Sequence, residues 1–146
     1  MKLLPLKTHK LHIVRNVEST TVPANGGRRT ILKIEDGAGT LKQISFRTTQ
    51  LTTEMHIRVD DEYTIEFPTV AQIITNHVMT TPYSPECFFA HKSAASPYGL
   101  TSTYKIDFEK SIEVVCLVSG TTAATVTDGF LVADLCTEEF IKENAW

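Results

Sequence analysis

The segment between residues 54 and 67 constrains the fold most, because it alternates apolar and polar side chains on both sides of an acidic turn. Its apolar positions are Met55, Ile57, Val59, Tyr63, Ile65 and Phe67. Alternation with a period of two is typical of strands that are buried on one face only. The turn Asp60-Asp61-Glu62 brings the two runs together, so the segment predicts a β-hairpin that packs one face against a core.

Shorter runs of the same kind recur along the chain and are separated by turn residues. We expect further strands at residues 11–17, 30–36, 41–48, 87–90, 103–108, 111–118, 123–128 and 130–135. In the third of these, Leu41 is out of phase with Ile44 and Phe46, which predicts a β-bulge near Gln43. Eight or nine short strands with regular turns favour an all-β sandwich or barrel over an α/β fold.

Several local signals predict how the strands are connected and how the chain ends. Glycines 37 and 39 predict a tight turn with positive backbone φ angles, and Ser96-Pro97-Tyr98-Gly99 predicts a turn within a loop over residues 91–101. Arg28-Arg29 follow two glycines and are expected at a solvated turn. Pro68 is expected to end the second strand of the hairpin.

One short helix is predicted over residues 69–76, with Thr69 as its N-cap and Gln72 in the capping-box position. Residues 1–12 read as an extended N-terminal arm. The tail 137–146 predicts a helical turn capped by Thr137, with acidic residues in its first turn. Together these features predict a single domain over residues 1–146.

Composition supports this class and excludes several functions. A chain of 146 residues is long enough to bury a core without staples. Its 21 threonines suit a pleated sheet surface, because β-branched side chains are favoured there. The net charge of −3 argues against a nucleic-acid partner, which requires a clustered basic face. No apolar run is long enough to cross a bilayer and no signal peptide is visible, so we expect no membrane partner.

The three cysteines, Cys87, Cys116 and Cys136, lack the spacing of a metal site. They are widely separated and odd in number, which favours reduced thiols in a chain that is made in a reducing cytoplasm. One disulfide remains an alternative. We expect no cofactor and no metal.

No group of residues argues for catalysis. The acidic turn 60–62 lacks the alternating ligands and glycine bend of a calcium loop. His56 shares a strand face with Asp60, and a solvated strand face explains this pair as well as a metal site does. Asp36, Glu54 and Glu66 are candidates for a pair of glycosidase carboxylates, but one sequence does not show which of them approach each other.

Aromatic residues near the two long loops offer a candidate surface for a ligand or a partner. Tyr83 and Tyr98 are the residues expected there, whereas Phe88-Phe89 are expected in the core. A sugar-stacking platform would require two or three coplanar exposed rings.

Four segments follow one another in a recognisable order. They are residues 35–46 (EDGAGTLKQISF), 54–60 (EMHIRVD), 63–68 (YTIEFP) and 104–114 (YKIDFEKSIEV). This order resembles small jelly-roll virion proteins of tailed bacteriophages. It is also similar to the jelly-roll modules of an assembly-forming glycoside-hydrolase family. The resemblance implies a jelly-roll-like antiparallel β-sandwich that assembles as a trimer or a ring.

The sequence thus predicts a non-enzymatic virion structural protein of a tailed phage, made in the host cytoplasm. It would be a head decoration protein or a tail or adaptor component, with copies of itself and other virion proteins as partners. The subunit contacts are expected at Leu3, Leu4, Leu6, Phe140, Ile141 and Trp146. The alternatives are a carbohydrate-binding jelly-roll module and a jelly-roll glycoside hydrolase, which would hold two carboxylates about 5–9.5 Å apart in a cleft.

Overall fold

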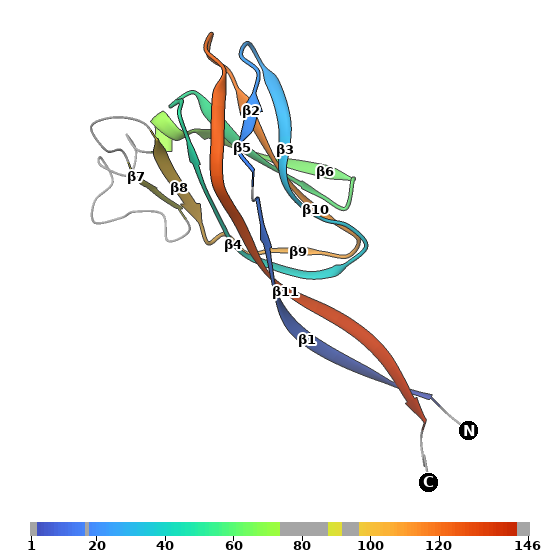
Figure 1. Cartoon of the computed structure of the whole chain (residues 1–146). Helices are drawn as coiled ribbons and strands as arrows, with labels where there is room; N and C mark the ends of the chain where they lie inside the picture. Colours follow the sequence, from blue (N-terminus) through green and yellow to red (C-terminus); the bar gives the residue numbers. More distant parts are fainter. Residues whose placement is uncertain (1–2, 17, 74–87, 92–96, 143–146) are drawn as a thin grey trace.

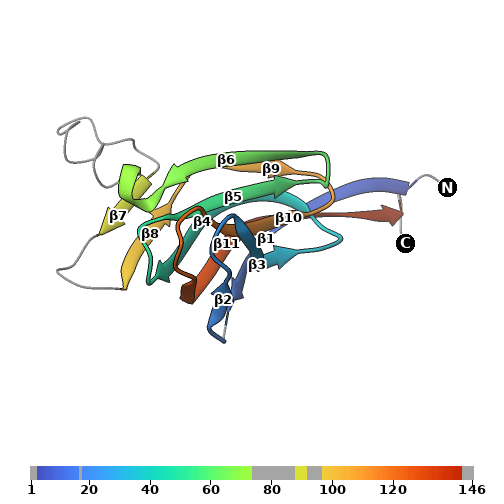
Figure 2. The same ribbon diagram turned by 90° about the horizontal axis from the view of Figure 1, so that it is seen from above.

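The structure is a computed structural model that describes residues 3–16, 18–73, 88–91 and 97–142. Two antiparallel β-sheets face each other and form a sandwich (Figures 1 and 2). The larger sheet contains β1 (Leu3–Arg15), β2 (Thr20–Val22), β4 (Ala38–Thr48), β7 (Phe88–His91), β8 (Tyr98–Ser102), β9 (Ile106–Phe108) and β11 (Ala124–Lys142). The smaller sheet contains β3 (Gly27–Ile34), β5 (Thr53–Val59), β6 (Tyr63–Thr69) and β10 (Ile112–Val118). The predicted all-β sandwich is confirmed.

The strand order is that of a jelly roll. The larger sheet runs β1-β11-β4-β8-β7, with β2 also paired to β11 and β9 paired to β4. The smaller sheet runs β3-β10-β5-β6. From β2 to β5, successive strands lie in alternating sheets, and β8, β10 and β11 alternate in the same way on the return path. Two interleaved antiparallel sheets of this kind are the double Greek key of jelly-roll domains.

The core lies between the two sheets, where their inward side chains meet. The largest fully buried side chains are Phe46, Leu41, Ile44, Met55, Ile57, Leu100, Ile112, Leu131, Val22, Val59, Val70 and Val114. Met55, Ile57 and Val59 come from the hairpin of β5 and β6, whose antiparallel pairing is the one predicted from the alternation. Burying one such side chain contributes about 1.5–3 kcal/mol.

The predicted β-bulge near Gln43 and the predicted capping box at Thr69 are both present. The register of β4 against β11 shifts between Gln43 and Leu41, which confirms the bulge and leaves Lys42 exposed. The chain is helical over residues 70–73, where the described segment ends. The Thr69 N–H donates to Gln72 Oε1 at 3.0 Å and the Gln72 N–H donates to Thr69 Oγ1 at 3.2 Å, so the capping box is formed. Residues 74–76 of the predicted helix lie outside the described residues.

Two segments predicted as turns, and one residue predicted to end a strand, lie within strands in the structure. Tyr98-Gly99 belong to β8 and not to a turn, because the segment pairs with β4 from Ile44 to Thr48. Arg28-Arg29 lie within β3 and not in a turn, as exposed residues of an edge strand. Pro68 does not end β6, since a proline is tolerated in an edge strand that offers its free side to solvent.

The turn between β3 and β4 differs from the expectation for its glycines. The positive φ of 51° lies at Asp36, and neither Gly37 nor Gly39 has a positive φ. Gly39 is needed for close approach instead: a Cβ there would collide with the carbonyl oxygen of Asp134 and lie 3.0 Å from the Cα of Leu135. The absence of a side chain at Gly39 therefore allows the backbones of β4 and β11 to approach each other closely at this point.

The two ends of the described chain form one long ribbon. β1 and β11 pair in register from Leu3 opposite Lys142 to Arg15 opposite Phe130. The C-terminal tail is thus a strand through Lys142 and not the predicted helical turn, because an isolated short helix is marginal and β1 offers in-register pairing. Likewise, the strand predicted at 11–17 begins at Leu3 and includes most of the predicted arm. The strands predicted at 123–128 and 130–135 are one strand, β11, with a register shift between Thr127 and Phe130.

Candidate subunit interface

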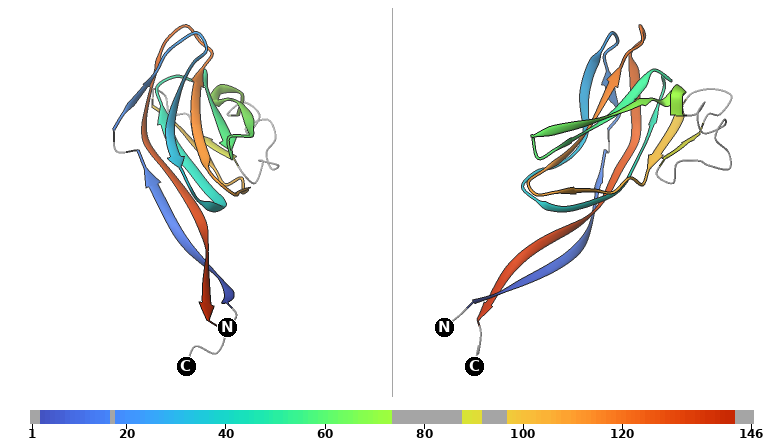
Figure 3. Two further views of the ribbon diagram at one scale, coloured as in Figure 1. Left: turned by 90° about the vertical axis from the view of Figure 1, so that its right-hand side faces the viewer. Right: turned by 180° about the vertical axis from the view of Figure 1, so that it is seen from behind.

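The ribbon of β1 and β11 extends beyond the sandwich, and both ends of the described chain lie at its tip (Figures 1 and 3). β4 last pairs with β11 at Ala38 opposite Cys136. Residues 3–8 and 137–142, which we call the distal ribbon, therefore pair only with each other among the described residues. A two-stranded ribbon without a packed face is marginal by itself in water. The distal ribbon is accordingly the part of the molecule that most needs a partner surface.

The distal ribbon brings together residues that are far apart in the sequence. Leu4 lies opposite Ile141, and Pro5 lies opposite Phe140. Five of the six residues predicted at subunit contacts are therefore on this ribbon: Leu3, Leu4, Leu6, Phe140 and Ile141. The sixth, Trp146, lies outside the described residues.

β1 separates from the core of the sandwich at residues where β11 is still packed against it. Residues 9–13 of β1 are all exposed, although the β11 partner of His12 is Ala133, which is fully buried. Leu11 is 61% exposed and Ile13 is 48% exposed. β1 is also the last strand of its sheet, so its second backbone edge has no strand partner among the described residues. An exposed edge strand of this length presents unpaired N–H and C=O groups to any chain that can pair with them.

The outer face of the larger sheet carries an apolar patch beside this edge. We define the outer patch as Leu11, Ile13, Phe130 and Val132. Ile13 lies opposite Val132, and the β11 residues of the patch are half-buried. A shallow hollow of about 680 Å³ is lined by Ile13, Phe130 and Val132, and the Arg47–Asp128 pair at 4.0 Å stands at its rim. This patch could not be predicted from the sequence, because periodicity shows that side chains alternate but not which face is covered.

The outer face of the smaller sheet is charged instead. Lys33 contacts Glu35 at 3.1 Å and Glu113 at 3.6 Å, and the Glu35 carboxylate holds the pKa of Lys33 above its ordinary value. His56 is 3% exposed and contacts Glu54 through Nε2 at 3.2 Å. A small hollow of about 220 Å³ is lined by Arg28, Arg29, Thr30, His56, Arg58, Thr64, Glu113 and Val115. Charges of both signs are interspersed on this face and some of them form ion pairs, as on an ordinary solvated sheet surface.

The loops at one end of the sandwich meet around Asp60, in the β5–β6 turn. Asp60 Oδ1 accepts hydrogen bonds from the backbone N–H groups of Glu109 at 2.9 Å, Lys110 at 2.7 Å and Ser111 at 3.1 Å. Partial desolvation acts to raise the pKa of Asp60, but these three N–H donors outweigh it and lower the pKa below its ordinary value. Asp60 therefore links the β5–β6 turn to the segment between β9 and β10.

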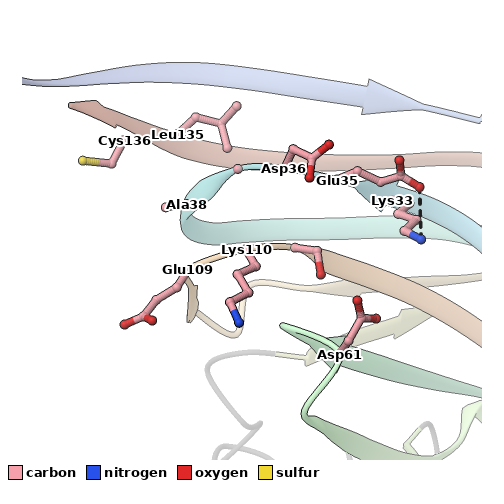
Figure 4. Close-up of a pocket in the computed structure, with 11 residues that line it drawn as sticks. Lys33, Glu35, Asp36, Ala38, Asp61, Glu109, Lys110, Leu135 and Cys136 are labelled. Carbon is pink, nitrogen blue, oxygen red and sulfur yellow. Dashed lines mark ion pairs between the residues drawn. The ribbon is translucent and has the colours of Figure 1, made fainter. Parts of the chain in front are cut away.

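A wide, open hollow of about 740 Å³ lies beside this junction (Figure 4). Its acidic lining residues are Glu35, Asp36, Asp61 and Glu109, and the basic ones are Lys33 and Lys110. Of the predicted glycosidase carboxylates, only Asp36 lies here. Glu54 contacts His56, and Glu66 is the register partner of His56. Glu54 and Glu66 therefore lie on the charged outer face of the smaller sheet. The three carboxylates do not share one cleft.

The described residues form neither a metal site nor a group of exposed aromatic rings at the predicted positions. Among the described residues, no group of three or more His, Cys, Asp or Glu is placed to hold a metal ion. Tyr98 is half-buried and packs against the core, and Tyr83 lies outside the described residues. The exposed rings in the described segments are Tyr63 at 50% and Tyr104 at 44%.

The two described cysteines, Cys116 and Cys136, are free thiols. Burial raises the pKa of Cys116 to about 12, which agrees with its expected role as a small core residue. Cys87 lies outside the described residues. No helix in the described parts of the chain is long and apolar enough to cross a membrane.

Comparisons with known proteins find a likeness among solved structures. No model of a known protein family matches the chain, and no curated protein sequence is significantly similar to it. Among solved structures, one similar chain belongs to the acidic stable capsid structure of Helicobacter pylori bacteriophage KHP30, with 13% identity and a TM-score of 0.46 over 96% of this chain and 100% of that chain. A likeness of this size does not establish a shared function, so the function has to be inferred from the surfaces of this chain.

Proposed function

We propose that this chain is a non-enzymatic structural protein of a tailed-phage virion and works through subunit contacts. It would serve as a head decoration protein or as a tail or adaptor component. The observation that carries the proposal is the distal ribbon, whose strands leave the sandwich and pair only with each other among the described residues. Such a ribbon gains stability when another subunit covers it.

The rest of the larger sheet supports the same reading. The outer patch and the open edge of β1 lie next to the distal ribbon, so the uncovered features form one continuous surface. Exposed apolar residues that are grouped in this way are typical of protein–protein contacts. The jelly roll is an architecture of viral capsid domains, and the sequence resembles small jelly-roll virion proteins. The proposed partners are copies of this chain, in a trimer or ring, and other virion proteins.

Sedimentation velocity of the purified chain over a wide concentration range tests the subunit contacts. The proposal predicts assembly of the wild type and weaker assembly of Leu4→Asp, which places a charge at a paired position of the distal ribbon. Thr122→Asp is the matched control, because Thr122 is an exposed residue of the turn before β11. A chain that stays monomeric at every concentration contradicts the proposal.

A second experiment tests the virion role. Particles that lack this chain, prepared by deleting its gene from the phage that encodes it, are mixed with the purified protein and separated from free protein by density. The proposal predicts that wild-type protein bands with the particles and that Leu4→Asp binds less. A failure of the wild type to bind, when it assembles with itself normally, would exclude the virion role and leave the subunit contacts standing.

A further inference from the structure

Two edge strands, which each pair with one strand among the described residues, carry opposite charge. β1 ends the larger sheet and β6 ends the smaller sheet. β1 carries Lys7, Lys10 and Arg15 and no acidic residue. The segment 61–69, which is β6 with part of its preceding turn, carries three acidic residues and no basic one.

The charge of β1 disfavours pairing between two β1 strands. Like charges that stand opposite each other across strands are destabilising, and an antiparallel β1–β1 pair would bring only basic and neutral residues together. The same holds for two β6 strands, where Asp61, Glu62 and Glu66 would meet. Opposite charges across strands are stabilising, so the favoured partner for a β1 edge is a β6 edge.

We propose that β1 of one copy pairs antiparallel with β6 of the next copy, which names the subunit contact and rests on the proposed function. One register pairs the apolar residues Leu11 and Ile13 with apolar residues and also pairs Lys10 with an acidic residue. Leu11 then lies opposite Ile65, and Lys10 lies opposite Glu66. In the same register Arg15 reaches Asp61, whose carboxylate is 70% exposed beside Arg58.

This register also matches the exposure of the two strands. Leu11 and Ile13 lie in one row of β1 and are largely exposed. They would meet Tyr63, which is 50% exposed, and Ile65, which is half-buried. The row of Lys10 would meet the exposed polar row of Glu66. Leu11 and Ile13 therefore meet apolar residues, and Lys10 meets an opposite charge, whereas Val14 faces Glu62 at the end of the contact.

The pairing is heterologous, because each copy contributes a different surface at each of its two ends. Such contacts repeat from copy to copy and produce a ring when the rotation closes. The predicted assembly is therefore a ring or an open chain of subunits and not a two-fold dimer. Because the charged pairs lie near solvent, the assembly should weaken as the salt concentration rises.

Charge reversal tests the pairing through a mixing experiment. Lys10→Glu damages only the β1 edge and Glu66→Lys damages only the β6 edge, so sedimentation should show that each variant alone assembles at least about tenfold more weakly than the wild type. In an equimolar mixture, Lys10 of one variant can still meet Glu66 of the other. The substituted residues at positions 10 and 66 of the two variants are also opposite in charge, so both edges of every copy find a complementary partner. The mixture should therefore assemble into rings or longer chains, and the double variant Lys10→Glu/Glu66→Lys, which carries the reversed pair in every copy, should assemble again.

The controls are charge reversals at exposed residues of other strands, Lys42→Glu on β4 and Asp107→Lys on β9, which should assemble like the wild type. Thermal melts of every variant separate a loss of pairing from a loss of folding. Normal assembly of either Lys10→Glu or Glu66→Lys overturns the pairing but leaves the proposed function intact. A wild type that never assembles refutes both.

Discussion

The hydrogen bonds of Asp60 allow a prediction with a built-in control at the next residue. Asp60 and Asp61 have nearly the same backbone conformation, with φ angles of 56° and 55°, which asparagine also tolerates. Asp60→Asn removes the charge that three backbone N–H groups share. Asp61→Asn removes only an exposed ion pair with Arg58 at 3.4 Å. The two substitutions make the same chemical change in two different surroundings.

The expected cost of Asp60→Asn is about 1.5–3 kcal/mol at pH 7, because a hydrogen bond to a charged group contributes that much and the amide oxygen keeps part of the set. For a chain of 146 residues this lowers the melting temperature by about 4–10 °C. Asp61→Asn should cost less than about 1 kcal/mol, as exposed ion pairs do. Urea unfolding followed by circular dichroism measures both values.

The lowered pKa of Asp60 also predicts how its contribution to stability changes with pH. The folded-state pKa of Asp60 is lowered from its ordinary value of 3.8, so the carboxylate stabilises the fold fully above that value. This contribution is lost as the pH falls through the folded-state pKa. The difference between wild type and Asp60→Asn should therefore be complete at neutral pH and shrink below about pH 4. A difference that stays constant down to acidic pH, or an equal cost for Asp61→Asn, would refute the reasoning.

Three further predictions concern packing and thiol chemistry. Gly39→Ala should destabilise the fold by about 1–3 kcal/mol in urea unfolding, because the new Cβ collides with the backbone of β11, whereas Gly99→Ala, with no atom within 4 Å of its Cβ, should change stability by less than about 0.5 kcal/mol. Phe46→Ala should cost about 3–5 kcal/mol by the same measurement, since Phe46 is 1% exposed in the core. Cys116, with a pKa of about 12, should react with a thiol reagent only after unfolding, whereas the half-buried Cys136 should react in the folded protein; equal labelling rates would contradict this assignment.

Features that depend on neighbouring residues could be predicted from the sequence. The β5–β6 hairpin follows from alternation and a turn, and the Thr69–Gln72 capping box follows from a spacing of three residues. The bulge at Lys42 follows from a single break in phase. In each case the deciding interaction lies within a few residues or within one strand face.

Features that depend on a distant partner could not be predicted in this way. The tail carries a local helix signal at Thr137, but its pairing with Thr8 of β1 decides its structure. Tyr98 carries a local turn signal, but it pairs with Thr48 of β4. Of the candidate interface, the apolar ends were predicted and the exposure of Leu11 was not, since exposure depends on where β1 leaves the sandwich.

Amide hydrogen exchange at different protein concentrations tests the central claim most directly, because it reports on the backbone edge itself. If subunits assemble through this edge, the amides of β1 around Leu11 and Ile13 gain protection as concentration rises, while Ile57 in the core is equally protected throughout. If the protein assembles and the β1 amides exchange as fast as in the dilute monomer, the edge is not the contact and the account is wrong.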